Sequence, residues 1–331
     1  MSDRATLLLT RSDVEALLDM RECIDAVEQA FRLCAEGKMP PAGILSVHVE
    51  GGGFHIKAAA MPGMPSFFAA KTNANFPANP AKHGLATIQG AILLFDGNTG
   101  SPLAIMDSTS VTALRTGATT AVAAKYLARR DASVLTLVGC GAQAGAQLRA
   151  VSAVRDLKRV FVSDIEPARA ARFAEQHREA LPIEVEPVSD LAAAISGSDI
   201  CVTCTPSRRF IVNRDWVPPG CLIAAIGADN EHKQEIDPAL FGSARVVVDS
   251  LEQCEKIGDL HHAIESGTIT RDGIHAELGE VVTGSKPARQ SDTETIVFDS
   301  SGVALGDVAA AAVVYAQALK RGRGTSLHLL D

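Results

Sequence analysis

The spacing of apolar positions changes along the chain and divides it into segments of different kinds. Between residues 11 and 37 apolar side chains recur at helical spacing, so we expect helices there. From residue 44 to 95 short β-like runs alternate with Gly and Pro, and Asp96-Gly-Asn-Thr-Gly100 has the composition of a hairpin turn. These features predict an α+β domain that extends to about residue 115.

Farther along, strand-like and helical segments alternate. The pattern is helical from Val111 to Leu127, and an alanine-rich last helix is expected over 308–319, where its apolar character suits packing against another domain or subunit. The alternation predicts an α/β domain with a doubly wound, mostly parallel sheet of Rossmann type and helices on both faces. The expected strands of this sheet are 134–138, 159–163, 200–205, 222–226 and 245–249.

Composition excludes several classes of protein. The 331 residues include 47% hydrophobic residues, an ordinary globular composition at a length that favours two domains. The formal net charge of -8 argues against a nucleic-acid partner, which needs a basic face. No segment reaches the about 20 apolar residues of a membrane span, and the first residues lack the features of a signal peptide.

The seven cysteines are an odd number in a long chain, which favours reduced thiols and a cytoplasmic protein over a disulfide framework. Cys201 and Cys204 have the CxxC spacing, but they lie in an apolar, β-branched run typical of a buried strand, where residues three apart face opposite sides. No second Cys or His pair completes a zinc site. We therefore expect no metal site.

A glycine-rich motif follows the first strand of the alternating region. Gly139-Cys-Gly-Ala-Gln-Ala144 has the GxGxxA pattern, a helix is expected after it, and Asp164 ends the next strand about 20 residues on. Gly139 permits the tight turn, Gly141 lets a pyrophosphate approach the backbone, and Ala144 allows close packing of helix on strand. The helix N-terminus attracts phosphate. The candidate cofactor-binding residues are Thr116, Gly139, Gly141, Ala142, Gln143, Asp164, Thr205 and Gly227.

The type of dinucleotide depends on Asp164. Its carboxylate would accept hydrogen bonds from the ribose hydroxyls and repel a 2′-phosphate, which favours NAD. Arg169 lies five residues on and could turn toward a phosphate, so NADP stays possible. The alternative is a Rossmann-like domain with an empty site.

Several segments together resemble the ornithine cyclodeaminase/mu-crystallin family, which includes archaeal alanine dehydrogenase and ketimine reductases. The resemblance implies a homodimer in which residues 1–115 and 308–331 form the substrate-binding and dimerisation domain, and 116–307 the Rossmann NAD(P)-binding domain. The matching segments are Ala70-Lys-Thr-Asn73, Leu94-Phe-Asp-Gly-Asn-Thr-Gly100, Met106-Asp107, Leu114-Arg-Thr-Gly-Ala118, Gly139-Cys-Gly-Ala-Gln143, Gly227-Ala-Asp229, Lys233-Gln-Glu235 and Val297-Phe-Asp-Ser-Ser-Gly-Val-Ala304.

The resemblance also implies roles for three residues. Arg115 matches the family's carboxylate-binding arginine, and a guanidinium suits bidentate pairing with a carboxylate. Lys71 matches the substrate lysine and would make a second contact to the carboxylate. Asp229, just past a strand, matches the catalytic aspartate that would bind the substrate nitrogen and move its proton. The structural alternatives are a domain-junction ion pair for Arg115, a strand-edge lysine and a loop or cap aspartate.

One departure from the family pattern bears on the substrate. Cyclodeaminases of the family carry another carboxylate-binding arginine in the segment that corresponds to 42–48, which has none here. Lys57 stands where they have a glutamate that contacts the distal amine of ornithine. A lysine there disfavours a distal ammonium group and could itself bind a carboxylate, unless it is a solvent-facing strand residue.

Three functions are consistent with these residues. We favour an NAD(P)H-dependent imino-acid (ketimine) reductase, running reversibly as an amino-acid dehydrogenase, with a small amino or imino acid as substrate. The second is an ornithine cyclodeaminase that recycles NAD while forming proline and ammonia. The third is a cofactor-gated small-molecule binding protein, which would not require Lys71, Arg115 and Asp229 together.

Overall fold

The structure, a computed structural model, describes residues 5–178 and 182–329. The described chain divides into two compact units. The first contains the residues up to Arg115 together with those from Ala304 onward, and the second contains Thr116–Val303. None of the helices in the described ranges combines the length and the apolar character that crossing a lipid bilayer requires.

The first unit contains a seven-stranded sheet in the order β17-β1-β6-β5-β4-β3-β2. All neighbouring strands are antiparallel except β1 and β6. The strands are β1 (Thr6–Leu9), β2 (Gly43–Val49), β3 (Gly52–Met61), β4 (Phe67–Asn75), β5 (Ile88–Asp96), β6 (Pro102–Asp107) and β17 (Thr325–Leu327). The helices are α1 (Arg11–Leu17), α2 (Met20–Ala35), α3 (Asn79–His83) and α12 (Ala304–Arg321).

Local chemistry accounts for several of these elements. Thr10 and Asp13 form a capping box at the start of α1, and Asp19 accepts two backbone N–H groups at the start of α2. The predicted hairpin turn is confirmed: β5 and β6 pair antiparallel, and the Asp96 carboxylate accepts the N–H groups of Asn98 and Thr99. Such side-chain bonds satisfy backbone donors that no strand or helix pairs.

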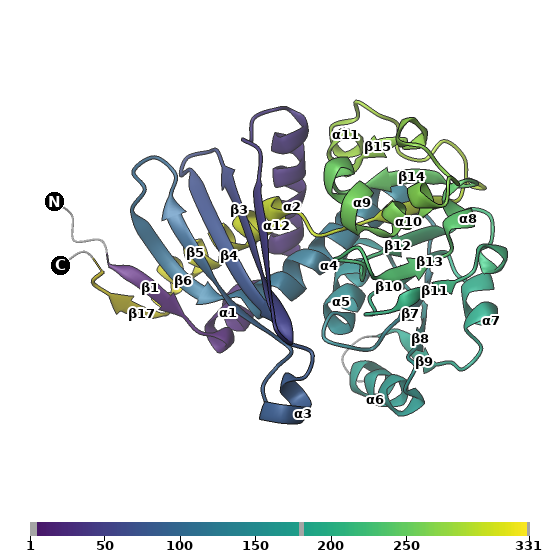
Figure 1. Cartoon of the computed structure of the whole chain (residues 1–331), viewed down its shortest axis with the longest axis horizontal. Helices are drawn as coiled ribbons and strands as arrows, with labels where there is room; N and C mark the ends of the chain where they lie inside the picture. The colour runs from purple at the N-terminus through teal and green to yellow at the C-terminus, as the bar shows by residue number, and fades with distance from the viewer. Residues whose placement is uncertain (1–4, 179–181, 330–331) are drawn as a thin grey trace. The chain divides into compact units, whose positions relative to one another are not determined.

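Helix α12 differs from its prediction. It begins at Ala304 rather than 308, and it packs inside its own unit against α2, β3 and β4 (Figure 1). Most of its apolar side chains are buried. The helix thus packs with the amino-terminal part of the chain, and packing against another subunit stays a prediction. Its alanines bring the helix close to the sheet, because small side chains shorten the distance between packed elements.

The other face of this sheet is apolar and exposed. Leu8, Ile105, Leu93 and Ala70 follow one another in register across β1, β6, β5 and β4, which places them on one face. Phe68, two residues from Ala70, lies on the same face, and its ring lies 6.0 Å from that of Phe95. Phe68 and Leu93 are 36% and 41% exposed.

The second unit contains an eight-stranded sheet in the order β15-β14-β16-β12-β10-β7-β8-β9, in which every pair is parallel. Its strands are β7 (Val134–Val138), β8 (Arg159–Ser163), β9 (Glu184–Pro187), β10 (Ile200–Thr203), β12 (Leu222–Ala225), β14 (Arg245–Val248), β15 (Ala276–Glu277) and β16 (Ile296–Asp299). A separate parallel pair consists of β11 (Arg208–Val212) and β13 (Gln234–Ile236).

Helices cover both faces of this sheet, as predicted (Figure 1). In β12 the consecutive residues Leu222 and Ile223 point to opposite faces of the sheet, and both are 0% exposed. Helix α4 (Ser108–Leu127) belongs to the first unit up to Arg115 and to the second from Thr116. The other helices of the second unit are α5 (Ala144–Val154), α6 (Pro167–Arg178), α7 (Leu191–Ser196), α8 (Pro238–Phe241), α9 (Leu251–Ile257), α10 (Asp259–Glu265) and α11 (Leu278–Thr283), with 3-10 turns η1 (Arg214–Trp216) and η2 (Arg271–Gly273).

The five predicted strands of this sheet are all present. Two match their predicted ranges, and β10, β12 and β14 end one or two residues early. The missing residues lie at the carboxyl ends, where the chain leaves the sheet to form loops. Those loops are where open parallel sheets bind ligands.

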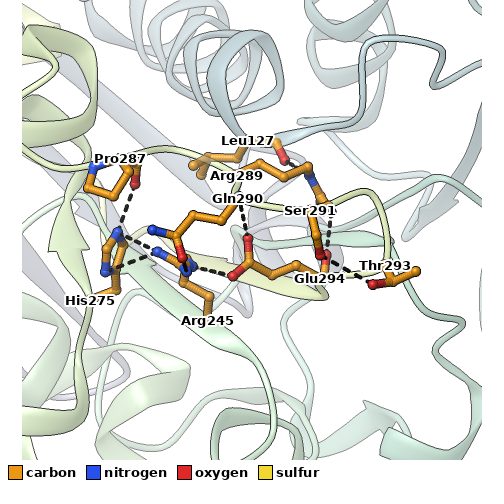
Figure 2. Close-up of polar contacts among 9 residues, drawn as sticks. All are labelled: Leu127, Arg245, His275, Pro287, Arg289, Gln290, Ser291, Thr293 and Glu294. Carbon is orange, nitrogen blue, oxygen red and sulfur yellow. Dashed lines mark hydrogen bonds and ion pairs between the residues drawn. The ribbon is translucent and has the colours of Figure 1, made fainter.

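A polar network anchors the connection between α11 and β16 (Figure 2). Arg289 donates to the Leu127 carbonyl at 2.9 Å and so caps the end of α4. Arg245 at the start of β14 pairs with Glu294 at 2.6 Å, and it also donates to Gln290 at 2.8 Å. A hollow of about 540 Å³ opens beside this pair, at the amino-terminal ends of the strands. It therefore lies at the edge opposite the ligand-binding edge.

Candidate active site

A buried cluster of charged groups lies in the first unit. Lys71 comes from β4 in the middle of the sheet, Arg115 from α4, and Asp307 from α12. The Lys71 ammonium donates to Asp307 Oδ1 at 2.9 Å and lies 2.8 Å from Oδ2, and Arg115 Nε donates to Oδ1 at 2.8 Å. The three side chains are between 2% and 6% exposed. Two cations therefore share one buried carboxylate.

Burial and neighbouring charges shift the pKa values in this cluster. Burial, together with the charges of Arg115 and Lys57, lowers the pKa of Lys71 to about 7, while the Asp307 carboxylate opposes this shift. Burial would raise the pKa of Asp307, but the charges of Arg115 and Lys71 outweigh it and hold that pKa below its ordinary value. The Lys71 amine is thus poised to gain or lose a proton near neutral pH.

Lys57 stands directly opposite Lys71 in the register of β3 and β4. Directly paired residues of neighbouring strands share a face, so Lys57 belongs to the face that carries Lys71. Its charge lowers the pKa of Lys71. The predicted residues Lys57, Lys71 and Arg115 are thus brought together within one unit.

Sequence reasoning missed Asp307. It is the acidic residue inside the apolar stretch Ala304-Leu-Gly-Asp-Val-Ala-Ala of α12, and an acid in a buried helix face needs a cationic partner. That signal was present in the sequence. The identity of the partners was not, because Arg115 and Lys71 lie 192 and 236 positions away.

The glycine-rich motif of the second unit has the geometry of a tight turn between β7 and α5. Gly139 has φ of 96°, and a Cβ there would meet Thr205 Cγ2 at 2.7 Å. Around Gly141, by contrast, a Cβ would meet nothing within 4 Å. The Ala144 side chain is 0% exposed where α5 begins. A close turn, open space beside Gly141 and a helix N-terminus are together what a pyrophosphate requires.

Asp164 lies just past the end of β8. It accepts hydrogen bonds from the N–H groups of Cys140 and Glu166, both at 2.9 Å, which ties it to the glycine-rich turn. Arg169 lies 3.4 Å from Asp164 and 2.5 Å from Glu166. This arginine is therefore held by two carboxylates in the structure.

The other predicted cofactor residues lie on neighbouring segments. Thr205 follows β10 and Gly227 follows β12, and these two strands pair directly. Thr116 lies in α4 and is 8% exposed, while Ala142 and Gln143 lie between Gly141 and α5. The predicted residues after β7, β8, β10 and β12 therefore share the carboxyl edge of one sheet.

Asp229 is two residues past Gly227, in an exposed loop. Its carboxylate pairs with Lys233 at 2.7 Å and accepts a hydrogen bond from the Asn230 side chain at 3.1 Å. It is close to half exposed, at 49% of its side chain.

The cysteines in and just after β10 carry no sign of special reactivity, because burial raises the pKa of both Cys201 and Cys204.

These features define a class of two-domain protein. Its second unit is doubly wound with a dinucleotide-type turn, and its first unit buries two cations on one carboxylate. The sequence profile of the ornithine cyclodeaminase/mu-crystallin family matches residues 4–322. The chain belongs to this family.

Relatives match over nearly the whole chain. Alanine dehydrogenase of Archaeoglobus fulgidus is 41% identical over 325 residues, which cover 97% of this chain and 98% of the relative. A solved archaeal alanine dehydrogenase dimer with bound NAD is 41% identical, with a TM-score of 0.93 and coverage of 98% and 99%. Thermococcus litoralis Delta(1)-pyrroline-2-carboxylate reductase, solved with NADH and L-proline, is 37% identical, with a TM-score of 0.92 and coverage of 97% and 99%.

Proposed function

We propose that this chain is an NAD(P)H-dependent imino-acid reductase that also runs in reverse as an amino-acid dehydrogenase. Hydride passes to or from the α-carbon of a small amino acid, whose imine is cyclic or formed from an α-keto acid and an amine. The observation that carries the proposal is the buried pair of cations, Lys71 and Arg115, on Asp307. The names of the two relatives, an amino-acid dehydrogenase and an imino-acid reductase, support it.

The first unit binds the substrate carboxylate under this proposal. Arg115 offers a planar guanidinium suited to a carboxylate, and Lys71 adds an ammonium. Asp307 fixes both cations by accepting from Arg115 Nε and from Lys71. Lys57 adds positive charge on the same sheet face. Fixed cations orient the substrate without losing side-chain freedom when it binds.

The second unit binds the dinucleotide, and NAD is the cofactor we propose, with NADP possible. The nicotinamide supplies or accepts the hydride. Gly139, Gly141, Ala142 and Gln143 with the α5 N-terminus bind the pyrophosphate, and Asp164 accepts from the ribose hydroxyls. Thr116, Thr205 and Gly227 complete the binding residues. The pairing of Arg169 with Asp164 and Glu166 supports NAD, because it turns the arginine toward acids.

Asp229 binds the substrate nitrogen and moves its proton. The Asp229 carboxylate is half exposed and pairs with the long, flexible side chain of Lys233. Such a carboxylate can exchange this partner for the substrate nitrogen during the reaction. Ornithine cyclodeamination is the alternative, and it is weakened by the absence of an arginine from 42–48 and by Lys57. A cofactor-gated binding protein is the alternative of another class.

One assay separates these functions. Purified protein is mixed with NADH or NADPH and a panel of cyclic imino acids and keto acid plus amine pairs, while ammonia release from ornithine is followed in parallel. Net oxidation of NADH with an imine is expected. Ammonia release with no net change in NADH would instead establish a cyclodeaminase, and ligand binding with neither reaction would establish a binding protein.

The Asp229→Asn variant tests the catalytic assignment. We expect it to bind NADH as the unchanged protein does but to lose about 10²- to 10⁴-fold in turnover, the usual contribution of a general acid–base group. Turnover and NADH affinity are measured on the same preparation. Asp272→Asn, at an exposed aspartate of η2, is the matched control and should leave both unchanged. Near-normal turnover in Asp229→Asn would remove this residue from the mechanism.

We also propose that the protein is a cytoplasmic homodimer that uses the exposed apolar face of the seven-stranded sheet. We propose that a second copy of this chain covers this face, since the similar archaeal structure is described as a dimer. Apolar faces of this kind mark interaction sites.

None of the seven cysteines, which all lie in described segments, forms a disulfide, and this supports a reducing compartment.

A further inference from the structure

A wholly buried carboxylate lies behind the ligand-binding edge of the second unit. Glu235, on the short strand β13, is 0% exposed. Its Oε1 accepts the N–H of Thr205 at 2.6 Å, and its Oε2 accepts the N–H of Gly227 at 2.7 Å. The Thr203 hydroxyl donates to Oε2 at 2.8 Å. One side chain thus joins the chain segments that leave β10 and β12.

These segments are packed too closely to shift independently. A Cβ on Gly227 would meet the Thr205 carbonyl oxygen at 2.3 Å and Glu235 Oε2 at 2.5 Å, so only glycine fits there. Thr205 in turn lies against the glycine-rich turn, since a Cβ on Gly139 would meet its Cγ2 at 2.7 Å. Glu235 therefore holds Thr205 between Gly139 and Gly227.

Burying this carboxylate is costly, and the compensation is specific. Within the described residues, Glu235 forms no ion pair with Lys, Arg or His, and its partners are the backbone N–H groups of Thr205 and Gly227 and the hydroxyls of Thr203 and Thr205. Its own backbone is also anchored, because Asp259 Oδ1 accepts the N–H groups of Glu235 and Ile236 at 2.7 and 2.8 Å. A buried charge persists only where such bonds offset its desolvation.

We propose that Glu235 is a positioning residue of the dinucleotide site, which fixes the turns after β10 and β12 in the arrangement that receives the cofactor. This rests on the proposed function. Glu235 does not touch substrate or cofactor, because it has no exposed surface. It acts through Thr205 and Gly227, whose N–H groups it holds in fixed directions.

The Glu235→Gln variant is the test. A glutamine keeps the shape but replaces one acceptor oxygen with an NH2 group, so either Thr205 N–H or Gly227 N–H loses its acceptor. We expect the NADH dissociation constant, measured by titration without substrate, to rise at least about tenfold. Turnover at saturating NADH should fall by a smaller factor than NADH affinity does, because no reacting group is replaced even though Asp229 lies in the loosened segment. Amide hydrogen exchange should accelerate in 203–207 and 225–229 but not in β7.

A matched control separates positioning from general loss of stability. Asp199 also accepts two backbone N–H groups, from Ser133 and Val134 at 2.8 and 3.0 Å, but at the amino-terminal edge of the same sheet. Asp199→Asn should lower the melting temperature as Glu235→Gln does and leave the NADH dissociation constant within about twofold. If Glu235→Gln fails to fold, Thr203→Val removes one donor to the same carboxylate and should still weaken NADH binding measurably.

Each outcome decides between the two proposals. An unchanged protein that binds neither NADH nor NADPH overturns the proposed function, and the positioning role with it. If that protein binds NADH and Glu235→Gln binds it equally well, the positioning role alone is wrong. The positioning role is also wrong if NADH binding weakens equally in Glu235→Gln and Asp199→Asn. Where Thr203→Val is the variant used, an unchanged NADH dissociation constant overturns the role as well.

Discussion

At the scale of single residues, Lys71 is the group whose charge state decides how the proposed substrate binds. Its ammonium is buried on β4, and burial, with help from Arg115 and Lys57, brings its pKa to about 7 against the pull of Asp307. A bound carboxylate favours the charged amine. Binding is therefore linked to uptake of a proton once the pH exceeds about 7.

The expected result is a pH dependence of substrate affinity. Below about pH 7 the Lys71 amine is already charged and affinity is flat, whereas above it the dissociation constant of a carboxylate ligand such as pyruvate rises up to about tenfold per pH unit. Titrations in the presence of NADH at several pH values measure this. Lys71→Met should bind weakly at every pH with a flat profile. A steep profile that survives in Lys71→Met would assign the titration to another group.

At the scale of elements, two glycines in the second unit have opposite surroundings. Gly117 of α4 faces α5, where a Cβ would meet the Ala146 carbonyl oxygen at 2.8 Å, while Gly141 faces open space. The first glycine therefore sets how closely two helices pack. The second leaves room beside the turn that precedes α5.

The two alanine variants should separate stability from cofactor binding. In Gly117→Ala, overpacking of about 1–3 kcal/mol exceeds the gain of about 1 kcal/mol in helix propensity, so the free energy of unfolding should fall. Gly141→Ala should unfold almost as the unchanged protein does but bind NADH at least about tenfold more weakly, because a methyl group fills the space for the pyrophosphate. Denaturant unfolding and NADH titration measure the pair. Tight NADH binding by Gly141→Ala would contradict the assignment of that space.

At the scale of the whole molecule, the apolar face of the seven-stranded sheet is the feature that a single chain leaves uncovered. We expect the double variant Phe68→Glu and Leu93→Glu to be monomeric by light scattering, because burying charge in an apolar interface is costly. Leu319→Glu places one such charge at an apolar residue of α12 that is 59% exposed, and this variant should remain dimeric. A double variant that stays dimeric would move the interface to another surface.

The second unit was the more predictable part of the fold. Strands β7, β10, β12 and β14 are buried on both faces, so they appear in the sequence as continuous apolar runs. The short strands β1 and β17 were not expected, because four and three residues carry too weak a pattern and their pairing joins the two ends of the chain. The last helix begins at Ala304 rather than at the predicted 308, and its apolar character indicated burial but not the elements against which it packs.

The sequence by itself determined five strands of the doubly wound sheet and the glycine-rich turn with its Asp164, because these depend on local spacing. The residues suited to a substrate carboxylate followed from the resemblance to the family. Tertiary structure alone decided that Asp307 pairs with Lys71 and Arg115, that Glu235 joins Thr205 to Gly227, and which sheet face stays exposed. Such pairings join residues far apart in the chain, and only folding brings a buried charge to the partner that offsets its desolvation.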